Sequence, residues 1–423
     1  MYQRTVLDNG LRVLTSEMPH TRSVSMFIAV GAGSRYEPDE LAGLSHFLEH
    51  LPFKGTRSWP TALAISEAVE GVGGMMNAAT DREMTSFWCK VASVYADRAL
   101  PVIFDLIRHP LMDPAEMEKE REVILDELRM TNDYPAQVCD LLIDRALWPA
   151  QAMGRDVGGT AESVAAIRLD DVQRYMGQQY RPNNTVIGIA GGISHDDAVR
   201  LVATATEDWQ PADPLPWEPV SAPSDGEPSV LLEHRVTEDT SICMGLPGFA
   251  LADADRYAAT VLNGVLGDGM SSRLFQNLRE TRGLTYDCHS SLSSYRDCGA
   301  LVVSCATEPS RAAEAIAATR EELKGLLLPA PASEVHKARE YIKGRLLMRM
   351  EDSRAVASWL ASQELLMDEI TTPDETANRI DEVTPDDVLR AAERLVGNPD
   401  LRLAIVGPHD DADEFGAAIN EGT

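Results

Sequence analysis

Two segments of the chain, 218 residues apart, have similar sequences. Residues 116–130 read EMEKEREVILDELRM, residues 334–348 read EVHKAREYIKGRLLM, and seven of the fifteen positions are identical. Two unrelated helices could converge on common helix-forming residues, but a match of this extent is rare by chance. The repeat therefore predicts a duplicated fold, in which each half of the chain builds a similar domain.

A proline-rich segment separates the two halves. Residues 211–228, PADPLPWEPVSAPSDGEP, contain six prolines and cannot continue a helix or a central strand. On either side the same elements follow in order: a strand at 24–30 or 241–246, then a helix at 42–51 or 253–266. We predict an α+β fold of two homologous domains, residues 1–210 and 229–423, each an antiparallel sheet packed with helices.

The composition is typical of a globular protein that is neither disordered nor fibrous. The chain is 44% apolar and 25% charged. No segment approaches the ~18 consecutive apolar residues that a membrane span needs. The first residues, MYQRTVLDNGLRVL, lack the basic and apolar regions of a secretion signal, and the six cysteines form no C-x-x-C pair. We expect a cytoplasmic protein with buried, unpaired thiols.

The net charge of −29 argues against binding to nucleic acid or to anionic membranes. Such a surface would attract cationic peptides. Solubility explains the acidic composition equally well, so the charge by itself does not define a partner.

Residues 45–56, SHFLEHLPFKGT, contain two of the nine histidines. On a helix, His46, Glu49 and His50 project from one face. Two imidazoles one turn apart can bind one Zn²⁺ at ~2.0–2.1 Å, and a glutamate beside them can accept a proton from the attacking water. The alternative at this stage is a pair of surface histidines without a metal.

A catalytic zinc usually has three protein ligands, and Glu127 is the candidate for the third. One stripe of the predicted helix 114–131 contains Met117, Glu120, Val123, Ile124, Glu127 and Leu128. A buried carboxylate is costly unless it is paired or binds a metal, although both carboxylates could lie at the edge of the stripe. Ala338 and Arg345 replace them in the second repeat, so the two carboxylates are special to the first.

These motifs resemble the pitrilysin-type inverzincin metallopeptidases, which include insulin-degrading enzyme and the mitochondrial processing peptidase. The matching segments are LDNGLRVL (7–14), GSRYEPDELAGLSHFLEH (33–50), FKGT (53–56), NAATDREMTSF (77–87), EKEREVILDE (118–127) and GMSSRLFQNLRETRGLTY (269–286). The resemblance therefore covers most of the chain. It implies that His46, His50 and Glu127 bind one zinc per chain, that Glu49 is the general base, and that Glu120 is an outer carboxylate that anchors a ligand.

The resemblance also implies two substrate contacts. Asn77 and Ala78 would lie on an exposed strand edge that pairs with an extended peptide, although an ordinary edge strand fits the same residues. Arg279 and Tyr286 would hold the peptide carbonyl and stabilise the oxyanion. Without the resemblance, these two would be interpreted as a surface ion-pair residue and a core tyrosine.

Three positions depart from the family pattern. Pro52 follows the zinc motif closely and must end or bend its helix, which puts the zinc affinity in question. Phe87 stands where a tyrosine is common, and Asp268 interrupts a glycine run. None of these changes removes a predicted catalytic group.

We therefore expect a zinc-dependent endopeptidase that hydrolyses oligopeptides or unfolded segments inside a chamber. The chain supplies two domains where chambered relatives need four, which predicts a homodimer. The alternative is a non-catalytic structural or partner subunit of the same family. Such subunits typically lose zinc ligands, whereas this chain keeps all of them.

Overall fold

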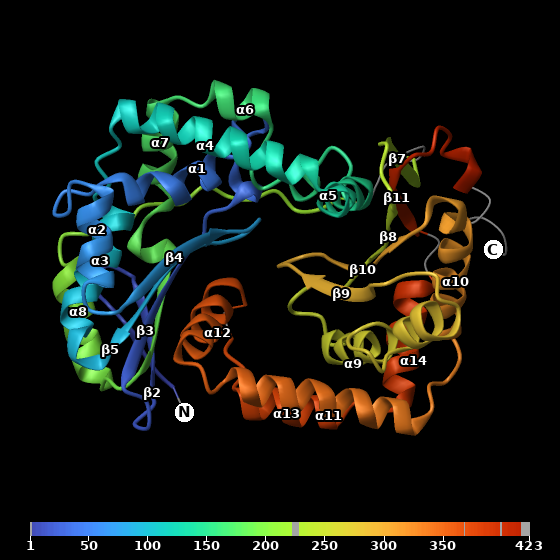
Figure 1. Ribbon diagram of the computed structural model, residues 1–423. Coiled ribbons are helices and arrows are strands. Elements are labelled where there is room, and N and C mark those ends of the chain that lie inside the picture. Colours follow the sequence, from blue (N-terminus) through green and yellow to red (C-terminus); the bar gives the residue numbers. More distant parts are fainter. Residues whose placement is uncertain (1, 222–227, 368, 398–399, 416–423) are drawn as a thin grey trace. The chain divides into compact units, whose positions relative to one another are not determined.

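The computed structural model describes residues 2–221, 228–367, 369–397 and 400–415. They form two compact units, each with one sheet and its own core (Figure 1). Unit 1 comprises Met1–Leu128, Asp156–Glu218 and Leu347–Thr372, and unit 2 comprises Arg129–Arg155, Pro219–Leu346 and Pro373–Thr423. The predicted α+β class is confirmed.

The sheet of unit 1 has the strand order β1-β2-β6-β3-β5-β4, so β4 is an edge strand. Its strands are β1 (Gln3–Val6), β2 (Arg12–Glu17), β3 (Ser23–Val30), β4 (Met75–Thr80), β5 (Thr85–Ala92) and β6 (Thr185–Gly191). All pairs are antiparallel except β2 with β6. The sheet is thus mixed rather than purely antiparallel as predicted. A parallel pair needs a long crossover, which the intervening chain supplies.

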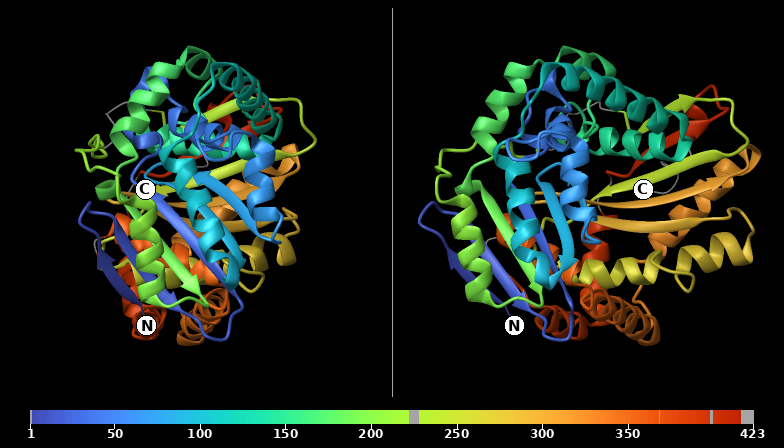
Figure 2. Two further views of the ribbon diagram at one scale, coloured as in Figure 1. Left: turned by 90° about the vertical axis from the view of Figure 1, so that its left-hand side faces the viewer. Right: turned by 60° about the vertical axis from the view of Figure 1, so that its left-hand side comes forward.

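Helices cover both faces of this sheet (Figure 1; Figure 2). On one side lie α2 (Ala62–Glu70), α3 (Ala96–Arg108) and α8 (His195–Thr206), and on the other lies α12 (Ser353–Leu366). The remaining helices of unit 1 are α1 (Leu44–His50), α6 (Ala161–Ala166), α7 (Leu169–Gln179) and most of α4 (Pro114–Asp133). The predicted helix at 114–131 corresponds to α4.

The sheet of unit 2 has the order β7-β11-β8-β10-β9. Its strands are β7 (Val230–His234), β8 (Thr240–Pro247), β9 (Cys288–Ser294), β10 (Gly299–Thr307) and β11 (Arg402–Gly407), and only β7 with β11 is parallel. The helices are α5 (Pro135–Leu147), α9 (Arg256–Leu266), α10 (Ala312–Gly325), most of α11 (Ala332–Arg349), α13 (Pro373–Asp381) and α14 (Pro385–Val396).

The two repeats exchange one helix. Helices α5 and α12 begin at residues 135 and 353, which is again an offset of 218, so they correspond in the duplication. Nevertheless α5 packs on β8 and β11 of unit 2, and α12 packs on β3 and β6 of unit 1. The units are therefore not the contiguous ranges 1–210 and 229–423. An apolar helix face shows that a helix is buried but does not show against which sheet.

Close packing of α12 on β6 depends on Gly188. A Cβ atom added there would lie 2.1 Å from the carbonyl oxygen of Ala357. We expect Gly188→Ala to lower the free energy of unfolding by about 2–3 kcal/mol, because the helix must shift. Gly177→Ala in α7 is the control: its nearest neighbour would be 4.0 Å away, so we expect no loss. Urea unfolding measures both, and equal stabilities would contradict the packing argument.

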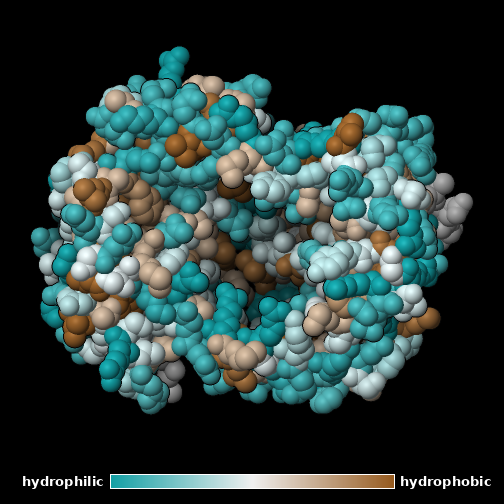
Figure 3. Space-filling view, viewed as in Figure 1, coloured by the Kyte–Doolittle hydropathy of each residue, from teal (hydrophilic) through white to brown (hydrophobic). Residues whose placement is uncertain are grey.

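Among the described residues, no helix combines the length and apolar character needed to cross a bilayer. Hydrophilic residues cover most of the face seen in Figure 3, with apolar residues scattered among them. All six cysteines are free thiols, and all but Cys298 are buried. The prediction of buried, unpaired thiols is confirmed for these five.

Candidate metal centre

A buried carboxylate holds the N-terminus of α1, the helix that carries the H-x-x-E-H motif. Glu37 accepts hydrogen bonds from the backbone N–H groups of Gly43 (2.8 Å) and Ser45 (2.5 Å). These N–H groups have no partner within the helix, and negative charge is favourable at this end. Sequence reasoning did not single out Glu37, although an acidic residue before a helix is a usual N-terminal signal.

Three side chains bring their ligand atoms together beside α1. His46 Nε2 lies 3.2 Å from His50 Nε2, and Glu127 Oε2 lies 3.6 Å from the first and 3.5 Å from the second. Ligands 2.0–2.1 Å from a tetrahedral zinc are about 3.3 Å apart. Within the described part of the chain, this trio is the one set of His, Cys, Asp and Glu side chains that could hold a metal ion. The three residues therefore fit zinc.

Glu120 anchors one of these histidines. Its Oε1 accepts a hydrogen bond from His50 Nδ1 at 2.9 Å, and its Oε2 pairs with the ammonium of Lys54. The Glu120 side chain is only 5% exposed. A histidine ligand usually donates its second ring N–H to a carboxylate of this kind. Glu120 therefore lies where the predicted outer carboxylate would act, and Lys54 joins it.

The pKa values of the two histidines shift in opposite directions. Burial lowers the pKa of His46 to about 4, with a further contribution from His50, so His46 is neutral at pH 7. Burial also acts to lower the pKa of His50, but the hydrogen bond with Glu120 and the charge of Glu127 raise it above its usual value. Burial alone would raise the pKa of Glu120, yet the hydrogen bonds from His50 and Lys54 lower it, which keeps this carboxylate ionised.

Pro52 does not disturb the turn that carries the histidines. Helix α1 ends at His50, and the chain continues as a 3₁₀ helix over Leu51–Lys54 with Pro52 near its start. Proline is tolerated in the first turn of a helix because the N–H it lacks would be unpaired there. The proline ends the α-helix after the second histidine rather than within the motif.

Glu49 lies three residues after His46 on the same helix and is half-buried. Strand β4 contacts α1, and its residue Thr80 donates a hydrogen bond to the carbonyl of Ser45. On β4 Asn77 is exposed, and its side-chain oxygen accepts the N–H of Ala78 at 2.9 Å. The free edge of β4 therefore lies beside the helix that carries Glu49.

Arg279 and Tyr286 lie together in unit 2. The guanidinium of Arg279 is 4.7 Å from the ring centres of both Tyr286 and Phe275. Arg279 belongs to a π-helix, Phe275–Thr281, a rare form that is frequent at functional sites. Tyr286 is 83% exposed, so it is not a core tyrosine. These two residues and the three metal-site residues belong to different compact units.

The second repeat has an ion pair where the first has the candidate metal ligands. At the offset of 218, the counterparts of His46, His50, Glu120 and Glu127 are Gly264, Asp268, Ala338 and Arg345. Asp268 and Arg345 are 3.4 Å apart, close to the 3.5 Å between His50 and Glu127. A guanidinium has no lone pair to donate to a metal. This pairing gives the unusual Asp268 a structural partner, and His46, His50 and Glu127 remain the one candidate metal centre among the residues that the structure describes.

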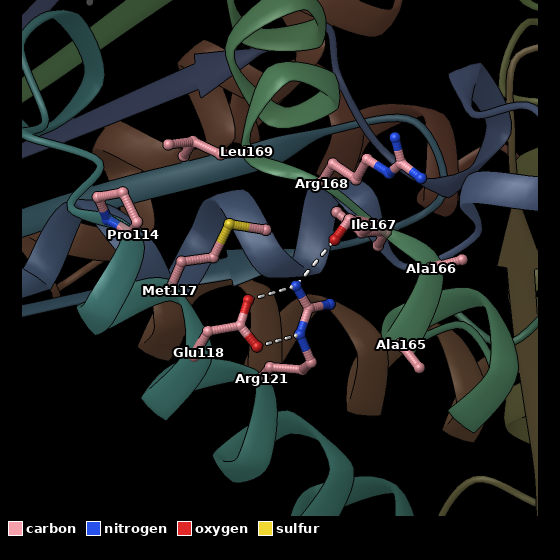
Figure 4. A pocket seen from close by; sticks show the side chains of 9 residues that line it. All are labelled: Pro114, Met117, Glu118, Arg121, Ala165, Ala166, Ile167, Arg168 and Leu169. Carbon is pink, nitrogen blue, oxygen red and sulfur yellow. Dashed lines mark hydrogen bonds and ion pairs between the residues drawn. The ribbon is translucent and has the colours of Figure 1, made fainter.

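A surface pocket of about 550 Å³ borders α4 (Figure 4). It is lined by Pro114, Met117, Glu118, Arg121 and residues 165–169. Arg121 pairs with Glu118 at 3.0 Å and donates to the carbonyl of Ile167 at 2.8 Å. Its counterpart Arg339 donates in the same way to the carbonyls of Asp381 and Val383, 2.7 and 3.1 Å away. Because both repeats use this arginine alike, its role is structural.

The sequence matches one family in two consecutive parts. Residues 12–161 match the description "Insulinase (Peptidase family M16)", and residues 166–342 match "Peptidase M16 inactive domain". The chain belongs to the M16 peptidase family. The predicted pitrilysin-type family is thus confirmed. Within this M16 chain, the H-x-x-E-H motif and Glu127 fall in the first match, whereas Asp268 falls in the match described as inactive.

Similar proteins align with nearly the whole chain. An "uncharacterized zinc protease" of Streptomyces coelicolor is 35% identical over 97% of this chain and 90% of its own length. An "uncharacterized zinc protease" of Bacillus subtilis is 33% identical over 96% of this chain and 98% of its own length. The crystal structure of a "peptidase M16 inactive domain" from Pseudomonas fluorescens aligns with a TM-score of 0.89 at 18% identity, covering 97% of this chain and 98% of that one. That last similarity establishes the fold.

Proposed function

We propose that this M16 protein is a zinc-dependent endopeptidase that hydrolyses oligopeptides or unfolded segments. The observation that carries the proposal is the convergence of His46 Nε2, His50 Nε2 and Glu127 Oε2 at distances of 3.2–3.6 Å, with Glu49 on the same helix. Three protein ligands with a glutamate beside them suit a hydrolytic metal centre rather than a closed structural one.

His46, His50 and Glu127 would hold the zinc. The metal, when bound, would polarise the scissile carbonyl and acidify water. Glu49 accepts the proton of the attacking water as the new C–O bond forms, and then passes it to the amide nitrogen, which leaves when the C–N bond breaks. The carboxylate of Glu120 keeps the Nδ1 proton of His50 in place, which leaves Nε2 unprotonated.

The substrate would bind as an extended strand. Its backbone pairs with the free edge of β4 at Asn77 and Ala78, which requires an unfolded segment and little sequence specificity. The side-chain oxygen of Asn77 must first release the N–H of Ala78. Arg279 and Tyr286 would hold the peptide carbonyl as donors to the developing oxyanion.

The test is cleavage of a peptide library by the purified protein with and without a zinc chelator. Cleavage that stops with chelator and returns with zinc supports the proposal. Zinc binding without cleavage would instead favour a non-catalytic subunit of the family. The complete set of His46, His50, Glu127 and Glu49 is the reason to prefer the enzyme.

The finer part of the proposal is a homodimer that encloses a chamber, with Arg279 and Tyr286 of one chain serving the zinc of the other. A two-fold dimer then has two composite sites. Two inactive variants, Glu49→Gln and Arg279→Ala, are mixed under conditions that exchange subunits. One site of each mixed dimer has both intact groups, so activity should return to about a quarter of wild type. No recovery despite demonstrated exchange contradicts the shared site.

A further inference from the structure

Lys54 lies at the end of the short 3₁₀ helix that follows the zinc motif. It comes four residues after His50, the last residue of α1. Both contact Glu120. The turn that begins around Pro52 thus gives Lys54 its position beside α4.

His50 and Lys54 each contact a different oxygen of the Glu120 carboxylate. Oε1 accepts from His50 Nδ1 at 2.9 Å, and Oε2 pairs with the Lys54 ammonium. The Glu120 side chain is 5% exposed and that of Lys54 is 31% exposed. Without Lys54, Oε2 would have to find another donor in a largely buried place, and the carboxylate could rotate away from His50.

Comparison with the second repeat shows which residues near Glu120 occur in both repeats and which occur only in the first. Glu120 corresponds to Ala338 at the offset of 218, and the segment 267–274 (GDGMSSRL) that follows α9 in the second repeat contains no lysine and no histidine. By contrast, the arginine that follows Glu120 occurs in both repeats, as Arg121 in the first and Arg339 in the second. The lysine is therefore present in the repeat that has the metal-site residues and absent from the one that lacks them. Packing of the common fold does not require it.

We propose that Lys54 is a positioning residue of the metal centre. It holds Glu120 in the orientation in which Oε1 accepts the Nδ1 proton of His50. The imidazole is thereby fixed in the tautomer and direction that present Nε2 to the metal together with His46 and Glu127. This inference rests on the proposed function only in that the wild-type protein must bind zinc.

The first measurement is the zinc dissociation constant, obtained by competition with a chromophoric chelator at fixed pH. Lys54→Met should weaken zinc binding about tenfold, at the lower end of what loss of an outer partner costs. Lys54→Arg keeps the positive charge and should stay within about threefold of wild type. Lys119→Met is the matched control, because Lys119 is 68% exposed and pairs with Glu116 on the surface of α4.

A double-mutant cycle separates positioning from a general loss of stability. If Lys54 acts through Glu120, adding Lys54→Met to Glu120→Ala weakens zinc binding no further than Glu120→Ala alone. Thermal unfolding of the metal-free variants confirms that each is folded. The same tenfold loss in both backgrounds, or no loss in either, overturns the proposal. A wild-type protein that binds no zinc overturns the proposed function itself, whereas a failed cycle in a zinc-binding protein overturns only the role of Lys54.

Discussion

Replacing Glu49 with glutamine is expected to lower the turnover number by about 10²–10⁴-fold, the usual contribution of a general acid–base group. Glutamine has nearly the same shape but cannot accept the proton of the attacking water. Zinc content should stay unchanged because Glu49 is not among the three side chains whose ligand atoms converge. The dissociation constant of an uncleaved peptide should change little, since β4 rather than Glu49 would bind the backbone.

Turnover of a fluorogenic peptide, zinc per chain and peptide affinity are measured on the same preparation. Glu40→Gln is the matched control, because Glu40 precedes the motif by a few residues and is exposed. The control should keep wild-type turnover. Wild-type turnover in Glu49→Gln would exclude Glu49 as the base, and loss of zinc in that variant would show that it is a ligand instead.

Replacing Glu127 with glutamine is expected to remove most of the zinc. The carboxylate supplies the anionic ligand atom, 3.5 and 3.6 Å from the two histidine nitrogens, and a neutral amide binds zinc poorly. The affinity loss should exceed the ~10–100-fold that removal of an outer partner costs. Activity should fall in parallel and recover in part when excess zinc is added, because Glu49 is intact.

Glu122→Gln provides the comparison on the same helix. Glu122 is exposed. A glutamate, Glu340, occupies the matching position of the second repeat, so Glu122 is not specific to the repeat that has the candidate metal ligands. Its replacement should leave zinc affinity unchanged. Zinc held by Glu127→Gln at wild-type affinity would reject the proposed ligand set, whatever the effect on activity.

The features that depend on local helix geometry could be predicted from the sequence. The spacing of His46, Glu49 and His50 places three side chains on one face because a helix repeats every 3.6 residues. The period of α4 likewise put Glu120 and Glu127 on one stripe, and the offset of 218 predicted the duplication. The resemblance to the metallopeptidases supplied the pairing of α1 with α4, which no local pattern contains.

Long-range packing decided the rest. The exchange of α5 and α12 between the repeats depends on which sheet face each helix buries, and two similar apolar faces do not specify this in sequence. The contact of Lys54 with Glu120 likewise joins two elements that are far apart in the chain. The Glu37 carboxylate is different, because it bonds N–H groups only a few residues further along the chain. The helical spacing of its residues thus allowed the zinc motif to be recognised from the sequence alone. The tertiary structure alone showed that Lys54 supports the predicted anchor Glu120, because that contact forms between elements far apart in the chain.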